Sequence, residues 1–127
     1  MTTYLQIFHN LFLESGYLKA LGAELAVETT AASEFQYFYP GLQKYDQFSR
    51  QDLIFFELHV LEEQQHSDWL IQAVCKTATT PEALDEVAAG ARQTADAWRT
   101  FWDGMTRAVF QPLQPTLKCQ TPKTQLP

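Results

Sequence analysis

One stretch decides the fold, and it reads Phe55-Phe56-Glu57-Leu58-His59-Val60-Leu61-Glu62-Glu63-Gln64-Gln65-His66. An α-helix turns by about 100° per residue, so His59, Glu63 and His66 fall within roughly 60° of one another on one face. The same face continues with apolar residues on both sides of this polar segment, namely Phe55, Phe56, Leu70, Ala73 and Val74. Polar side chains that face a core need partners. The stretch therefore predicts a helix that turns metal-ligand residue types toward the protein interior.

The composition of the chain limits which classes of protein it can belong to. The chain has 127 residues, of which 46% are hydrophobic, and this is the size of a single domain with one core. The net charge of −6, without a cluster of Lys or Arg, argues against nucleic acid or an anionic membrane as a partner. No membrane-spanning run and no signal-peptide pattern is present, so we expect a cytoplasmic protein. Cys75 and Cys119 lack ligand-like spacing, and we expect reduced thiols.

Two helices are predicted before this stretch. Apolar residues recur at helical spacing from Tyr4 to Gly16, and again from Tyr17 to about Tyr39, where Pro40-Gly41 predicts the end of the second helix. His9, in the first helix, is isolated. An isolated histidine beside apolar residues is more often a packed or half-exposed side chain than a ligand, so we leave His9 out of the site.

The second predicted helix contains a carboxylate that could face the core. Glu28 lies inside the apolar stripe of that helix, and Glu24, about 40° away, is a second inward-facing candidate. Taken alone, Glu28 is equally compatible with a solvated position at the rim of the core. The inward stripe of His59, Glu63 and His66 favours a ligand role for Glu28.

The third helix is predicted from near Ser49 to about Thr77, because Ser49 and Asp52 resemble a capping box. It carries a second apolar line nearly opposite the polar stripe, formed by Ile54, Leu58, Leu61 and Trp69. A helix that is apolar on two sides is expected at the centre of its bundle. Glu62 is expected to be exposed to solvent, although its position next to Glu63 makes it the alternative candidate for the same ligand role.

A fourth helix is predicted from Thr80 as N-cap and Pro81 as first helical residue to about Phe110. Its expected core seam is Leu84, Ala88, Ala91, Ala95, Trp98, Trp102, Met105 and Val109. Residues 111–127 are rich in Pro and Gln and are expected to be a disordered tail after a helical domain of residues 1–110. No strand-like alternation, repeat or phosphate-binding loop appears. The fold class is therefore all-α, a bundle of about four helices.

The chemistry rests on the candidate metal ligands Glu28, His59, Glu63 and His66. Two imidazoles and two carboxylates form a mixed nitrogen and oxygen set, which suits iron, or less favourably manganese, and does not exclude zinc. The pair Glu63-x-x-His66 is also the spacing that di-iron bundle proteins project inward. The competing interpretation is a network of hydrogen-bonded buried polar residues in a helical interaction protein without catalysis.

The pattern Phe55-Phe56-x2-His59-x3-Glu63-x2-His66, after Glu28 in Leu21-Gly22-Ala23-Glu24-Leu25-Ala26-Val27-Glu28, resembles the second half of the haem-oxygenase-like di-metal oxidases. These proteins are related in fold to the TENA and pyrroloquinoline-quinone synthase families. The resemblance implies ligand roles for the four candidate residues. It also implies a non-haem, di-iron centre that activates dioxygen to oxidise a small amino-acid-like or fatty-acid substrate.

Members of that family carry a further Glu and His on an earlier helix, which the resemblance does not locate in this chain. With at most four protein ligands, two metal ions would be undersupplied. Three expectations follow: a truncated family member, a homodimer that completes the site between two copies, or a binding module without turnover. A TENA-like binder of a small molecule, without metal, is a further alternative. The aromatic run Phe35, Tyr37, Phe38 and Tyr39 favours the homodimer.

Overall fold

The computed structural model describes residues 4–110, apart from the side chain of Gln64. Its elements are α1 (Tyr4–His9), a π-helical turn η1 (Asn10–Glu14), α2 (Tyr17–Leu42), α3 (Ile54–Thr77) and α4 (Pro81–Phe110). Residues 4–110 contain no strand, which confirms the predicted all-α class. No helix in this range is long and apolar enough to cross a membrane. The predicted tail and Cys119 lie outside the described residues, and Cys75 is an exposed free thiol.

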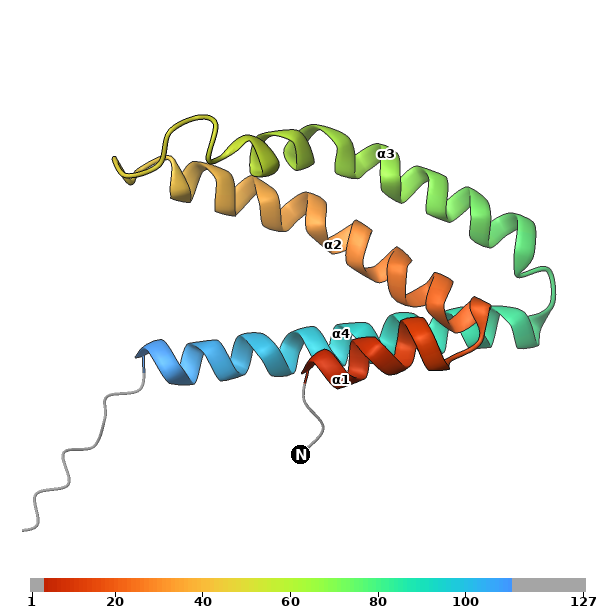
Figure 1. Cartoon of the computed structure of the whole chain (residues 1–127). Coiled ribbons are helices and arrows are strands. Elements are labelled where there is room, and N and C mark those ends of the chain that lie inside the picture. Colours follow the sequence, from red (N-terminus) through yellow and green to blue (C-terminus); the bar gives the residue numbers. More distant parts are fainter. Residues whose placement is uncertain (1–3, 111–127) are drawn as a thin grey trace, which may run out of the picture.

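Helix α2 is the central element of the bundle. Figure 1 shows α2 and α3 running antiparallel, with α4 and α1 on the other side of α2. Helix α2 packs against both α3 and α4, and α1 packs against α4. The prediction that the third helix is central was wrong. Helix α3 packs mainly on α2, and its second apolar line is exposed, with Leu61 70% accessible.

Helices α2 and α4 approach closely because both are built from small residues where they cross. Gly22 and Ala23 of α2 are buried there, opposite Val87 and Gly90 of α4. Small side chains let two helix backbones come close together. The buried face of α4 is Val87, Gly90, Thr94 and Ala97. The predicted seam of α4 was therefore wrong in part, since Leu84, Ala95, Met105 and Val109 are exposed.

The helix ends follow local hydrogen bonding, with two corrections. Thr80 caps α4 as predicted, because its Oγ1 accepts a hydrogen bond of 3.2 Å from the Ala83 N–H. Ser49 and Asp52 do bond reciprocally, but they close a turn, and α3 begins only at Ile54. Helix α2 continues through Pro40 to Leu42. Near the end of a helix the lost N–H of a proline removes one bond without preventing a final turn, and here the Gln43 N–H still bonds to Tyr39 O.

Candidate metal centre

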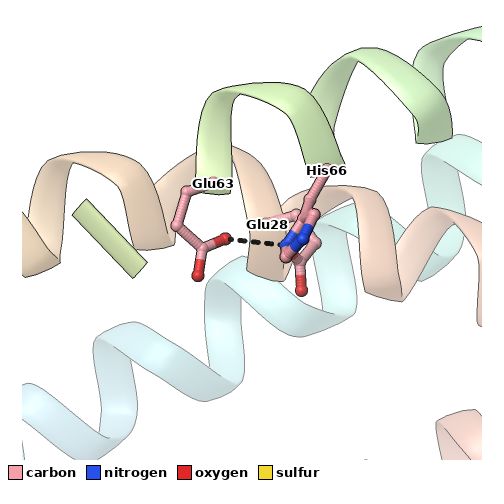
Figure 2. Close-up of side chains that lie close together, drawn as sticks. All are labelled: Glu28, Glu63 and His66. Carbon is pink, nitrogen blue, oxygen red and sulfur yellow. Dashed lines mark hydrogen bonds and ion pairs between the residues drawn. The ribbon is translucent and has the colours of Figure 1, made fainter. Parts of the chain in front are cut away.

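Helices α2 and α3 bring three of the four predicted ligands to one point. Glu28 comes from α2, and Glu63 and His66 come from consecutive turns of α3 (Figure 2). One potential ligand atom from each residue lies within 4.8 Å of the other two. His66 Nδ1 is 3.1 Å from Glu28 Oε2 and 3.8 Å from Glu63 Oε2. This is the spacing of groups that a single cation between them would draw together.

Glu63 is the most deeply buried of these residues. It is 2% exposed, and its Oε2 has no hydrogen-bond partner among the described residues. The pKa of Glu63 is raised to about 7, chiefly by burial and then by the neighbouring Glu28 carboxyl group, while His59 and His66 act in the opposite direction. A buried carboxylate with an unsatisfied oxygen costs free energy in the protein alone. A bound cation would satisfy it.

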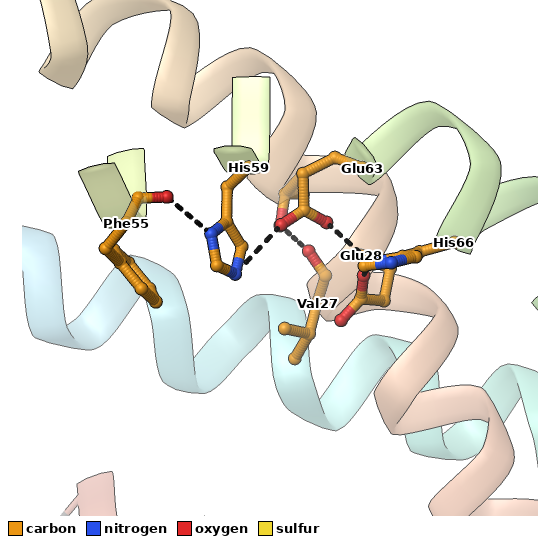
Figure 3. A network of polar contacts seen from close by, with 7 residues as sticks. Val27, Glu28, Phe55, His59, Glu63 and His66 are labelled. Carbon is orange, nitrogen blue, oxygen red and sulfur yellow. Dashed lines mark hydrogen bonds and ion pairs between the residues drawn. The ribbon is translucent and has the colours of Figure 1, made fainter. Parts of the chain in front are cut away.

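His59 lies on the other side of the Glu63 carboxylate (Figure 3). Its Nε2 is 3.8 Å from Glu63 Oε1, whereas His66 faces Oε2. The Nδ1 of His59 is 2.6 Å from the Phe55 carbonyl oxygen, an acceptor, so this nitrogen carries the proton and donates. The lone pair is therefore on Nε2, directed toward Glu63. His59 thus lies beside the Glu63 carboxylate, but outside the group formed by Glu28, Glu63 and His66.

Aromatic side chains hold both imidazoles in place. The His59 ring lies 4.0 Å from the Phe55 ring and 4.8 Å from the Phe35 ring, measured between centroids. The His66 ring stacks on Trp69 at 5.8 Å. Rings fixed by packing present their nitrogen atoms with little loss of rotamer entropy, which favours a preformed binding site.

A cavity of about 300 Å³ connects the two sides of the site. Its lining residues are Val27, Glu28, Ala31, Glu34, Phe35, His59, Glu63, His66 and Trp98. Two of these, Glu34 and Trp98, are polar residues that the sequence analysis did not assign to the site. The spacing of Val27, Ala31 and Glu34 on α2 was the available signal, since residues i, i+4 and i+7 share one helix face.

The remaining candidates take different positions. Glu24 lines a neighbouring cavity together with Glu28 and His66, and burial and then the Glu28 charge raise its pKa. Glu62 is exposed, so it does not replace Glu63. His9 is exposed on α1, and it does not line the cavity that holds Glu63.

Comparison with known proteins assigns the chain to a family. A family model described as an iron-containing redox enzyme, of haem-oxygenase-like type, matches residues 1–99. The chain belongs to this family. No curated protein and no solved structure matches the chain. Within this iron-containing redox enzyme family, the donor set around Glu63 is the part of the structure that suits iron, because imidazole nitrogens and carboxylate oxygens are ligands that iron accepts.

Proposed function

We propose that this chain binds iron through Glu28, Glu63 and His66, with His59 on the second side of Glu63, and oxidises a small molecule with dioxygen. The observation that carries the proposal is the Glu63 carboxylate. It is buried, it is unsatisfied at Oε2, and it lies between two histidines and a second carboxylate. In a protein of an iron-containing redox family, this arrangement is best explained as a metal site.

The ligands are prepared by their surroundings. Phe55 O accepts the Nδ1 proton of His59 and leaves Nε2 as the donor atom. His66 Nδ1 lies 3.1 Å from Glu28 Oε2, so the α2 and α3 ligands are already in contact. Because Glu63 holds a proton near neutral pH, cation binding would release protons from the site.

Bound iron would supply redox chemistry with dioxygen, and the protein would supply the enclosure. Phe35, Val27 and Ala31 provide apolar walls to the cavity, which limits water near the ligands. A cavity of about 300 Å³ is at the small end of ligand sites, so it favours a small substrate, amino-acid-like or a fatty-acid portion.

The experiment is an anaerobic Fe(II) titration of the purified chain, with its mass in solution measured alongside. Stoichiometric iron that reacts when dioxygen is admitted is the expected result. A chain that binds no iron contradicts the proposal and favours the metal-free, TENA-like binder or the non-catalytic interaction module. Binding of a small molecule to the metal-free chain, measured by calorimetry, would separate those two.

A further inference from the structure

The connection between α2 and α3, residues 43–53, forms a cavity that is separate from the metal centre. It lies at the end of the α2–α3 hairpin opposite the turn that leads from α3 into α4 (Figure 1). The cavity has a volume of about 470 Å³, which is typical of sites for small molecules. Its lining residues are Leu42, Gln47, Phe48, Asp52, Leu53 and Phe56. None of them lines the cavity that contains Glu63.

Most of the wall of this cavity is apolar. Leu53 is 5% exposed and forms its buried side. The Phe56 ring is half-buried and packs edge-on against Phe35 and Phe55, with centroids 5.9 Å and 5.4 Å away. Phe48, on the connection itself, is 39% exposed. The apolar part of a bound molecule would therefore meet two aromatic rings, one of them fixed by its neighbours.

Among the lining residues only Asp52 carries a charge. Its Oδ2 accepts hydrogen bonds of 2.7 Å from the Ser49 hydroxyl and 2.8 Å from the Ser49 N–H. These bonds, the hydroxyl first, lower the pKa of the Asp52 carboxyl group, so it is ionised at neutral pH. No ion pair neutralises it within residues 4–110, because the nearby Arg50 pairs with Glu57. Since both bonds use Oδ2, the other oxygen, Oδ1, is available to a ligand.

The end of α2 adds to the negative potential at the cavity. Helix α2 ends at Leu42, which lines the cavity, and the carboxyl end of a helix carries a partial negative charge. The faces of aromatic rings also attract cations. A carboxylate, a helix end and two aromatic rings thus all favour a positively charged ligand, and no Lys, Arg or His is among the lining residues.

We propose that this cavity binds a small organic cation, namely a protonated amine with an apolar body. The ammonium group contacts Asp52 Oδ1, and the apolar part packs against Phe48 and Phe56. The site goes beyond the proposed metal function, because none of its residues is a candidate metal ligand. It is linked to the metal centre through aromatic rings, since Phe56 packs on Phe35, which packs on His59.

The test is a calorimetric titration of the metal-free full chain at neutral pH with phenethylamine, which carries one ammonium group on an aromatic body. Phenethyl alcohol has nearly the same shape and no charge. We expect the amine to bind at least tenfold more tightly than the alcohol, because only the amine forms a charge-assisted hydrogen bond with the Asp52 carboxylate.

Three variants locate the site. Asp52→Asn removes the charge but keeps an oxygen that accepts from Ser49, so the turn is preserved, and it should weaken amine binding at least tenfold. Asp46→Asn changes an exposed acid of the same connection that does not line the cavity, and it should bind like the wild type. Glu63→Gln should also bind the amine like the wild type, because Glu63 lines the other cavity. Thermal unfolding followed by circular dichroism checks that each variant is folded.

The outcomes separate this inference from the proposed function. Equal binding of amine and alcohol, or amine binding that Asp52→Asn leaves intact, would mean that the cavity does not select cations. Absence of amine binding would mean that the cavity is an unfilled part of the turn, and loss of binding in Glu63→Gln would place the amine in the metal cavity. Each of these results overturns the inference. Because the titration contains no metal, a chain that binds no iron contradicts the proposed function and leaves this inference unaffected.

Discussion

Gly22 of α2 lies directly against the backbone of Val87 in α4, so that a Cβ atom added to Gly22 would be 1.9 Å from the Val87 carbonyl oxygen. Gly90 of α4 is in the same situation, since its added Cβ would be 1.9 Å from Lys19 O. No side chain rotation relieves a contact with backbone. Helices α2 and α4 can therefore pack at this distance only because positions 22 and 90 have no Cβ atom. The position of Trp98 beside the cavity depends on the same close packing.

Gly22→Ala is expected to destabilise the protein by roughly 1–3 kcal/mol or more, because the two helices must separate. Thermal unfolding followed by circular dichroism measures this. Gly41→Ala is the control, since an added Cβ there meets nothing within 4 Å and alanine favours the helix. Equal melting temperatures for Gly22→Ala and the wild type would show that the helices do not cross at this distance in solution.

His66→Ala is expected to lower Fe(II) affinity at least tenfold, and His59→Ala should do the same, while helix content stays largely unchanged. The reason is that both rings face the Glu63 carboxylate and neither is fully buried, so they contribute more to binding than to packing. Anaerobic titration and circular dichroism give the two quantities. His9→Ala, on the exposed surface of α1, should bind like the wild type. Wild-type iron content in both cavity variants would disprove the ligand assignment.

The pH dependence of stability should report the Glu63 carboxyl group. Its pKa is about 7 in the folded protein and 4.5 ordinarily, so the folded state holds the proton more tightly. The stabilisation is complete below about pH 4.5 and is lost as the pH rises through 7, a change of roughly 3 kcal/mol. Glu63→Gln removes this dependence.

Urea unfolding of the chelator-treated protein at about pH 5 and about pH 8 measures the effect. The free energy of unfolding of the wild type, taken relative to Glu63→Gln, should be lower at the higher pH. Glu62→Gln, with its exposed side chain, should follow the wild type. A difference between wild type and Glu63→Gln that is the same at both pH values would mean that Glu63 titrates normally.

The homodimer stays a prediction, and the exposed apolar line of α3 supports it. Leu58 and Leu61 are 48% and 70% exposed, one turn apart on one face. In a two-fold symmetric dimer this apolar line would pack against the same line of the second copy, so both copies would bury it. Leu61→Lys should weaken self-association at least tenfold, because burial of one Leu contributes about 1.5–3 kcal/mol. Sedimentation over a range of concentrations tests this, and a wild type that is monomeric throughout contradicts it.

Helical spacing was sufficient to bring the candidate metal ligands together, but not to identify every residue that lines their cavity. Glu63 and His66 are three residues apart, so one helix brings them together, and the apolar surroundings of Glu28 indicated that it faces inward. Glu34 was not predicted to line this cavity, because its side chain is held by Trp98, which is 64 residues away on another helix. Periodicity along one helix contains no information on which other helix supplies a partner.

The errors in the fold have the same origin. Leu58 and Leu61 suggested a central helix, but an apolar face can remain exposed when no neighbour covers it. On α4, the predicted core face was assigned from large apolar residues such as Leu84 and Met105, and Gly90 was not included in it. The structure buries the glycine because close approach of backbones contributes more contact there than a large side chain would.

The positions of the candidate ligands on α2 and α3 also predict an order of assembly. Glu28 and His66 are 38 residues apart in the chain, whereas Glu34 and Trp98 are separated by 64. Contacts over a shorter loop form at a smaller cost in chain entropy, so the hairpin of α2 and α3 is expected to form before α4 docks. A cation could then enter while the side later occupied by Trp98 is still open. Iron supplied during folding should consequently load faster than iron supplied to the finished protein.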